Sequence, residues 1–153
     1  MNKTNAILIT YPQENSIKEA FALADAVGYN IIKTVTQRYL SKAKYGIGAG
    51  KAEEVKNFVE ELKPKVIIFD EVLRSTQVYN LAKLLQIEII DRERLILEIF
   101  EKRASTAESS IQVKLAQLRY EMTRAREKVR LAKQGEQPGF FGIGRYEVDN
   151  YYR

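Results

Sequence analysis

The 153-residue sequence contains neither cysteine nor histidine. Their absence excludes disulfide bonds, thiol nucleophiles, zinc sites built from Cys and His, and every mechanism that needs a histidine base. No uncharged apolar run approaches the roughly 18 residues that cross a bilayer, and no secretion signal opens the chain. We therefore expect a cytoplasmic protein without a membrane partner, with no metal site, and with chemistry restricted to carboxylates, Lys, Arg, hydroxyls and backbone amides.

The net charge of +5 is concentrated in one segment. Residues 1–113 are nearly neutral, whereas residues 114–133 carry seven basic residues and only two acidic ones, Glu121 and Glu127. Such a segment attracts a polyanion, while scattered charge mainly confers solubility. The basic residues of this segment are Lys114, Arg119, Arg124, Arg126, Lys128, Arg130 and Lys133.

Apolar strands and amphipathic helices alternate through the first hundred residues. Short runs rich in β-branched residues predict strands at 6–11, 29–36, 65–70 and 87–91. Helical spacing predicts helices over 14–27, 52–62, 75–86 and 92–103, the first ended by Gly28 in a left-handed conformation. Residues 1–104 are therefore interpreted as a small α/β domain of parallel βαβ units with helices on both sheet faces.

A second region, residues 105–153, begins with a long helix. Ser105 and Glu108 form a capping-box pattern, and no breaker follows until about residue 134. At about 40 Å this helix is expected to project beyond the domain, with a seam that needs a partner helix. After a glycine-rich loop the chain is expected to stop inside the returning helix of an antiparallel hairpin. The heptad-spaced seam consists of Ile111, Leu115, Leu118, Met122, Ala125, Val129 and Ala132.

Glycines cluster before the second predicted helix, in the segment Tyr45–Lys51. The segment departs from a phosphate-binding P-loop, because position 45 is Tyr and position 52 is Ala. A tight turn against a neighbouring segment is one interpretation. Anion or nucleotide contact at the helix N-terminus is the other. The residues available for such contact are Gly46, Gly48, Gly50 and Lys51.

Acidic residues follow two of the predicted strands. Asp70 and Glu71 follow the third and Asp91 ends the fourth, at the sheet edge where open α/β folds place ligands. A receiver-like phosphoacceptor site would also need an acidic pair after the first strand, where Tyr11 and Pro12 stand instead. Capping of the next helix is the favoured role, and it suits Asp91 in particular.

Two interpretations of the basic helix at 114–133 are open: its cations form a solvated face, or they contact RNA. The two acids leave most of the bases without partners at helical spacing. The helix leads into a glycine-rich tip with Phe140 and Phe141, which could stack on RNA bases or could cap the hairpin seam. We expect the seven basic residues and both phenylalanines to bind RNA.

Four motifs in order resemble one family, the HflX GTPases. Gly48–Val55 resembles the family's Gly-x-Gly-Lys-x-Glu-Glu. Phe69–Gln77 with Asn80 and Leu81 resembles its Asp/Asn-Glu-Leu-Ser-Pro-x-Gln-x-x-Asn-Leu element. Asp91-Arg92, Leu95–Phe100 and Arg103-Ala104 also match. The most similar segment is Gln112–Leu118 with Tyr120, close to Gln-Val-Glu-Leu-Ala-Gln-Leu-x-Tyr, although Lys114 replaces the usual Glu.

The resemblance implies the N-terminal part of a ribosome-associated GTP hydrolase. It implies an α/β domain with a helical hairpin that contacts the large ribosomal subunit and its rRNA. GTP and Mg²⁺ are expected in a GTPase domain outside these residues, so this chain is expected to hold no cofactor, to be inactive by itself, and to contact that GTPase domain in the full-length protein. Two alternatives remain: nucleotide binding through Gly46–Lys51, and a homodimer joined through the helix seam.

Overall fold

The computed structural model describes residues 3–133. In this part of the chain, four strands and four helices alternate before one long helix. The elements are β1 (Thr4–Thr10), α1 (Glu14–Ala26), β2 (Tyr29–Thr36), α2 (Ala49–Leu62), β3 (Val66–Phe69), α3 (Ser75–Leu85), β4 (Glu88–Asp91), α4 (Arg92–Arg103) and α5 (Ala107–Lys133).

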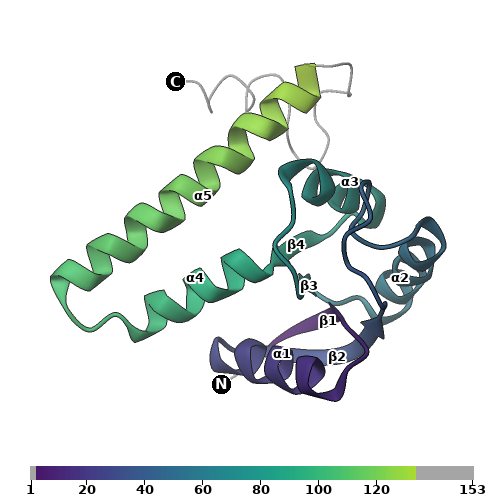
Figure 1. Ribbon diagram of the computed structural model, residues 1–153, viewed down its shortest axis with the longest axis horizontal. Helices are drawn as coiled ribbons and strands as arrows, with labels where there is room; N and C mark the ends of the chain where they lie inside the picture. The colour runs from purple at the N-terminus through teal and green to yellow at the C-terminus, as the bar shows by residue number, and fades with distance from the viewer. Residues whose placement is uncertain (1–2, 134–153) are drawn as a thin grey trace.

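All strand pairs are parallel, and the strand order is β2-β1-β3-β4. The predicted α/β class is therefore confirmed. The order changes direction between β1 and β3, which is where open sheets form a crevice at their carboxyl ends. Figure 1 shows α1 and α4 on one side of the sheet, with α2 and α3 on the other.

Alternating residues of β1 and β3 fill two cores, one on each sheet face. Ile7 and Ile67 belong to the core under α2 and α3, while Leu8 and Ile68 belong to the core under α1. All four side chains are completely buried. Burial on both faces explains why these strands are continuous apolar runs rather than alternating ones.

Several helix ends differ slightly from the sequence prediction. Helix α2 begins at Ala49, three residues early, because Gly48 is its N-cap. Its first turn therefore holds no acidic residue. The cap of α5 is Thr106 rather than Ser105: Thr106 Oγ1 accepts the backbone N–H of Ser109 at 3.0 Å. Gly28 has the predicted left-handed conformation, with φ of 89°.

Helix α5 turns back after α4 and contacts both α4 and α3 (Figure 1). The long final helix is confirmed, and its second half lies against the domain instead of standing free. Ala125 and Val129 are its buried residues. The predicted glycine-rich loop and returning helix lie outside the described residues. None of the helices in residues 3–133 is both long and apolar enough to span a membrane.

Candidate functional site

The completely buried carboxylate of Asp91, at the end of β4, joins four segments. It accepts the backbone N–H of Leu73 at 3.0 Å and that of Arg94, also at 3.0 Å, so it caps α4 as predicted. From α5 it accepts the Tyr120 hydroxyl at 3.0 Å and Arg124 Nη2 at 2.8 Å. The sheet edge and α5 are therefore fixed to each other by one carboxylate.

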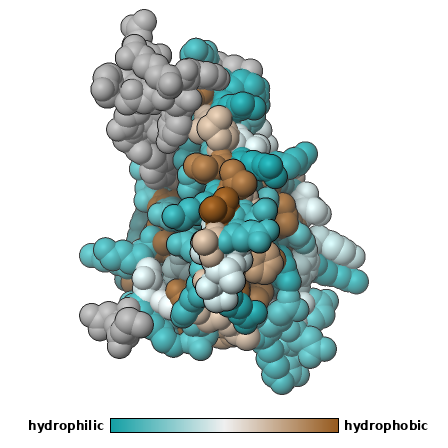
Figure 2. All heavy atoms as spheres, turned by 90° about the vertical axis from the view of Figure 1, so that its left-hand side faces the viewer, coloured by the Kyte–Doolittle hydropathy of each residue, from teal (hydrophilic) through white to brown (hydrophobic). Residues whose placement is uncertain are grey.

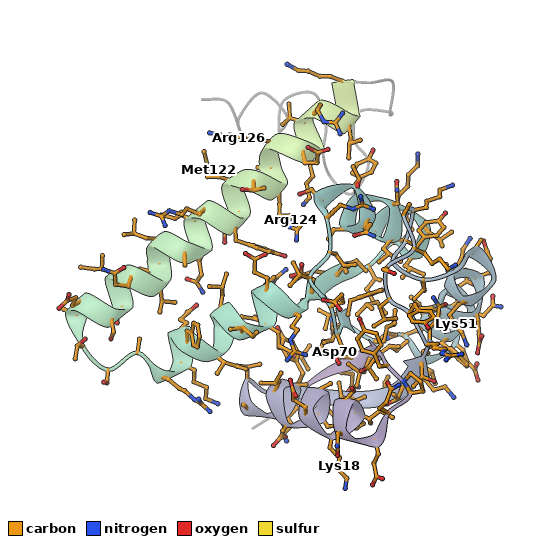
Figure 3. The ribbon with its side chains drawn as sticks, in the orientation of Figure 1. Lys18, Lys51, Asp70, Met122, Arg124 and Arg126 are labelled. Carbon is orange, nitrogen blue, oxygen red and sulfur yellow. The ribbon has the colours of Figure 1, made fainter. Side chains whose placement is uncertain are left out.

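Arg124 faces the domain, not the solvent (Figure 3). Its side chain is 13% exposed. Besides Asp91, it donates to the Leu73 carbonyl at 2.6 Å and to Ser75 Oγ at 3.0 Å, and it lies over the Tyr120 ring at 4.9 Å. Three donor contacts of Arg124 are therefore directed at the domain, which favours an anchoring role for this side chain over the expected phosphate contact.

The other cations of α5 divide between two sides of the helix. Lys114, Arg119 and Arg126 are exposed, and within residues 3–133 their side chains have no acidic partner. Arg130 is exposed and pairs with Glu127. The spacing of Arg119, Arg126 and Arg130 by seven and four residues places them on one face. We call this face the arginine ridge; Figure 3 shows Arg126 pointing away from the domain.

Lys128 lies on the inner side of α5, in a cavity of about 820 Å³ next to β4. Burial lowers the pKa of its ammonium group, and Arg94 adds repulsion while Glu88 opposes it. Lys133 is exposed at the helix end. The structure therefore separates the seven predicted basic contacts into outward and inward groups, a division that net charge alone does not reveal.

An apolar stripe runs beside the arginine ridge. It consists of Ile111, Leu115, Leu118 and Met122, with exposed fractions of 44–58%. Figure 2 shows hydrophobic side chains gathered in a band with hydrophilic residues on both sides. The first half of the predicted seam is thus exposed, while Ala125 and Val129 of the second half are buried.

The glycine segment is a packed turn. Gly46 has φ of 78°, and a Cβ there would lie 2.6 Å from the Phe69 ring. Its N–H donates to the Lys42 carbonyl at 2.8 Å, and the N–H of Gly48 donates to Gln37 Oε1 at 3.1 Å. Lys51 is paired with Glu54. The tight-turn interpretation therefore explains this segment, because two of the amides needed for an anion site already have internal partners.

At the carboxyl ends of β1 and β3, Asp70 is held within a polar cluster. It accepts Thr10 Oγ1 at 2.6 Å and Arg92 Nη1 at 2.7 Å. Burial raises the pKa of Asp70, against the opposing effects of Thr10 and Arg92. Nearby, burial and then Glu71 raise the pKa of Tyr11 to about 12. Asp70 and Glu71 therefore have hydrogen-bond partners within the protein, Thr10 and Arg92 for Asp70 and Tyr11 for Glu71, which favours a structural role for both carboxylates.

Among residues 3–133, no group of three or more acidic side chains is placed to hold a metal ion. Phe140 and Phe141 lie outside the described residues. Sequence reasoning missed Tyr120 as a partner of Asp91; its only sequence signal was the spacing of four residues from Arg124 along one helix face.

Two family models match the chain. Residues 14–101 match the family described as GTP-binding GTPase N-terminal, and residues 103–153 match GTP-binding GTPase Middle Region. The division between them falls in the last turn of α4, shortly before the connection to α5. The Asp91–Arg124 contact therefore joins the two matched regions.

Curated relatives share the name GTPase HflX. The protein from Methanocaldococcus jannaschii is 48% identical over 138 residues, which cover 90% of this chain and 34% of that protein. The Thermococcus kodakarensis protein is 42% identical, covering 91% and 33%, and the Escherichia coli protein is 36% identical, covering 87% and 32%. The chain thus spans about a third of the length of these relatives.

Solved structures show the same fold. A variant of the protein named SsGBP has a TM-score of 0.69 at 26% identity, covering 81% of this chain and 41% of that chain. A GTP-binding protein from Sulfolobus solfataricus in complex with GDP has a TM-score of 0.66 at 23% identity, covering 97% and 43%. With the two family models and the curated relatives, these findings show that the chain belongs to the HflX family of GTP-binding proteins and carries its N-terminal and middle regions.

Proposed function

We propose that this chain is the ribosome-binding and regulatory part of an HflX-type GTPase, and that α5 contacts RNA of the large ribosomal subunit. The observation that carries the proposal is the arginine ridge. Arg119 and Arg126 are exposed and have no acidic partner among residues 3–133. Cations on one helix face are suited to successive phosphates of a nucleic acid backbone, and they provide most of its non-specific affinity.

The proposed contact set follows from the placement of the side chains. The outward cations of α5 bind phosphate, whereas Arg124 and Lys128 support the helix from its inner side. Phe140 and Phe141 keep their proposed role in stacking on bases. The residues proposed to contact phosphate are Lys114, Arg119, Arg126, Arg130 and Lys133.

GTP and Mg²⁺ belong, in this proposal, to a GTPase domain outside residues 1–153. Within the described chain, the N–H groups of Gly46 and Gly48 are already used in internal hydrogen bonds, and Lys51 is paired with Glu54. The N-terminal and middle regions would then act on GTP hydrolysis only by contacting that domain. A cytoplasmic location follows from action on ribosomes.

Sedimentation with large ribosomal subunits at increasing salt tests the proposal. The variant Arg119→Gln/Arg126→Gln should bind more weakly than wild type. It should also reduce the steepness of the fall of log affinity with log salt by about 1.4 to 1.8, because each phosphate contact contributes ~0.7 to 0.9. Neither change touches the Asp91 anchor, so the fold should persist.

The matched control is Lys18→Gln/Lys65→Gln, which removes the same charge from the opposite part of the molecule (Lys18 in Figure 3). Both lysines are exposed. We expect this control to bind as wild type does. Equal weakening by both variants would show that net charge alone drives binding, and unchanged binding by the ridge variant would refute the proposal.

The exposed apolar stripe favours a second candidate function, self-association. Four side chains that are each 44–58% exposed could pair with the same stripe of a second chain. Buried Val129 cannot take part, so the contact would be shorter than the sequence seam suggested. Light scattering at high protein concentration tests this, with Leu118→Gln as the variant. A monomeric wild-type protein would exclude the dimer.

A further inference from the structure

A cavity of about 620 Å³ lies between the start of α3 and the middle of α5. It is on the opposite side of Tyr120 and Arg124 from the cavity that holds Lys128. Pockets of ~300–1,000 Å³ commonly hold small-molecule ligands. The residues that line it are Leu73, Arg74, Ser75, Thr76, Glu93, Ala116, Arg119, Tyr120, Thr123, Arg124 and Glu127.

Two arginines from different elements provide its free positive charge. Arg74 precedes α3 and Arg119 lies on α5, and neither has an acidic partner in the part of the chain that the structure describes. Glu93 also lines the cavity and opposes them. The remaining charges are compensated, since Arg124 pairs with Asp91 and Glu127 with Arg130. An excess of one positive charge therefore remains for an incoming anion.

The cavity also contains hydrogen-bond donors. Arg74 is the N-cap residue of α3, and its side chain has no acceptor atom that could bond the first N–H groups of the helix. The backbone N–H of Arg74 donates to Gln77 Oε1 at 2.8 Å. Within the described residues, the N–H groups of Ser75 and Thr76 have no acceptor. Arg124 holds Ser75 Oγ at 3.0 Å and so fixes this wall of the cavity. Free amides and guanidinium groups together are the donors that phosphate oxygens require.

We propose that this cavity binds one phosphate group of a single-stranded RNA, between Arg74 and Arg119. The inference rests on the proposed function and adds a specific site to it. RNA fits better than a free ion because Arg119 belongs both to the cavity and to the arginine ridge. A strand whose phosphates follow the ridge can therefore place one of them in the cavity, and the remaining volume accepts the adjoining nucleoside.

A double-mutant cycle tests whether Arg74 and Arg119 share one phosphate. Fluorescence anisotropy with a labelled single-stranded oligoribonucleotide gives the affinity of the protein. Arg74→Gln should weaken binding about fivefold to tenfold and should make the negative slope of log affinity against log salt shallower by about 0.7. The double variant Arg74→Gln/Arg119→Gln should lose less affinity than the product of the two single losses, because both side chains bind the same group. Arg74→Gln and Arg126→Gln should act independently.

Lys65→Gln is the matched control, since it also removes one exposed charge. It should leave both the affinity for the oligoribonucleotide and its salt dependence unchanged. If wild type binds RNA but Arg74→Gln binds equally well, the cavity proposal fails while the ridge proposal stands. If wild type does not bind RNA, both fail. Multiplicative losses for Arg74 and Arg119 would refute a shared phosphate.

A parallel titration with uridine monophosphate distinguishes a phosphate of RNA from that of a free nucleotide. If this nucleotide binds saturably, and if Arg74→Gln abolishes its binding without an effect on RNA binding, the cavity belongs to a free nucleotide and the RNA assignment is overturned.

Discussion

The sheet and helix α5 are held in place by different interactions. Strands β1 and β3 are packed by apolar side chains on both faces, and Ile7 and Ile67 are completely buried. Helix α5 has two buried residues, Ala125 and Val129, and meets the sheet edge at the Asp91–Arg124 pair. Cavities of about 620 and 820 Å³ flank this pair. The sheet therefore depends on apolar burial, whereas the position of α5 depends strongly on one buried charge pair.

The largest difference in the free energy of unfolding should be seen when a large apolar side chain is replaced by Ala in the sheet and, separately, in α5. Ile67→Ala should lower the free energy of unfolding by about 3 to 4 kcal/mol, because it leaves a cavity in a fully packed core. Leu118→Ala, on the exposed stripe, should change it by less than about 0.5 kcal/mol. Urea denaturation followed by circular dichroism measures both. Losses of similar size would show that the stripe is buried in solution and would contradict the comparison.

Arg124→Met should lower the free energy of unfolding by less than Ile67→Ala does, and its effect should be confined mainly to α5. Loss of one partner from a fully buried pair costs roughly 3–5 kcal/mol. Here about 2 kcal/mol is expected, because α5 can move and let water reach Asp91. Hydrogen exchange should become faster in α5 and stay slow in β1 and β3. Arg126→Met, whose side chain points outward, is the control and should leave exchange unchanged. Unchanged exchange in α5 of Arg124→Met would refute the anchor.

This contrast explains which features the sequence could predict. Strand β3 and the centre of β1 were predictable because both of their faces are buried, so residues 66–69 and 6–9 form continuous apolar runs. Gly28 was predictable because a left-handed helix end favours glycine over other residues. The N-cap of α4 was predicted correctly as Asp91, because this residue directly precedes the helix. These features are local, and each is encoded within a few neighbouring residues.

The role of Arg124 was not predictable in the same way. Its partner Asp91 is 33 residues earlier in the chain, and a run of basic residues does not indicate which side of the helix meets the domain. The glycine segment was ambiguous for a similar reason, since the contact that requires Gly46 is with Phe69. Both assignments depend on tertiary contacts between segments, which periodicity and composition do not contain.

The smallest effect should distinguish the inner cations of α5 from the outer ones. Burial lowers the pKa of Lys128 below the usual 10.5, so between the two pKa values the folded state binds fewer protons than the unfolded state. The free energy of unfolding should therefore rise with pH in the window below 10.5. Lys128→Met removes the half-buried charge. It should stabilise the protein by up to about 1 kcal/mol at neutral pH and should lose this advantage as the pH rises. Exposed Lys114→Met should show neither effect in urea denaturation. A pH dependence shared by both variants would place Lys128 in solvent and return it to the candidate phosphate contacts.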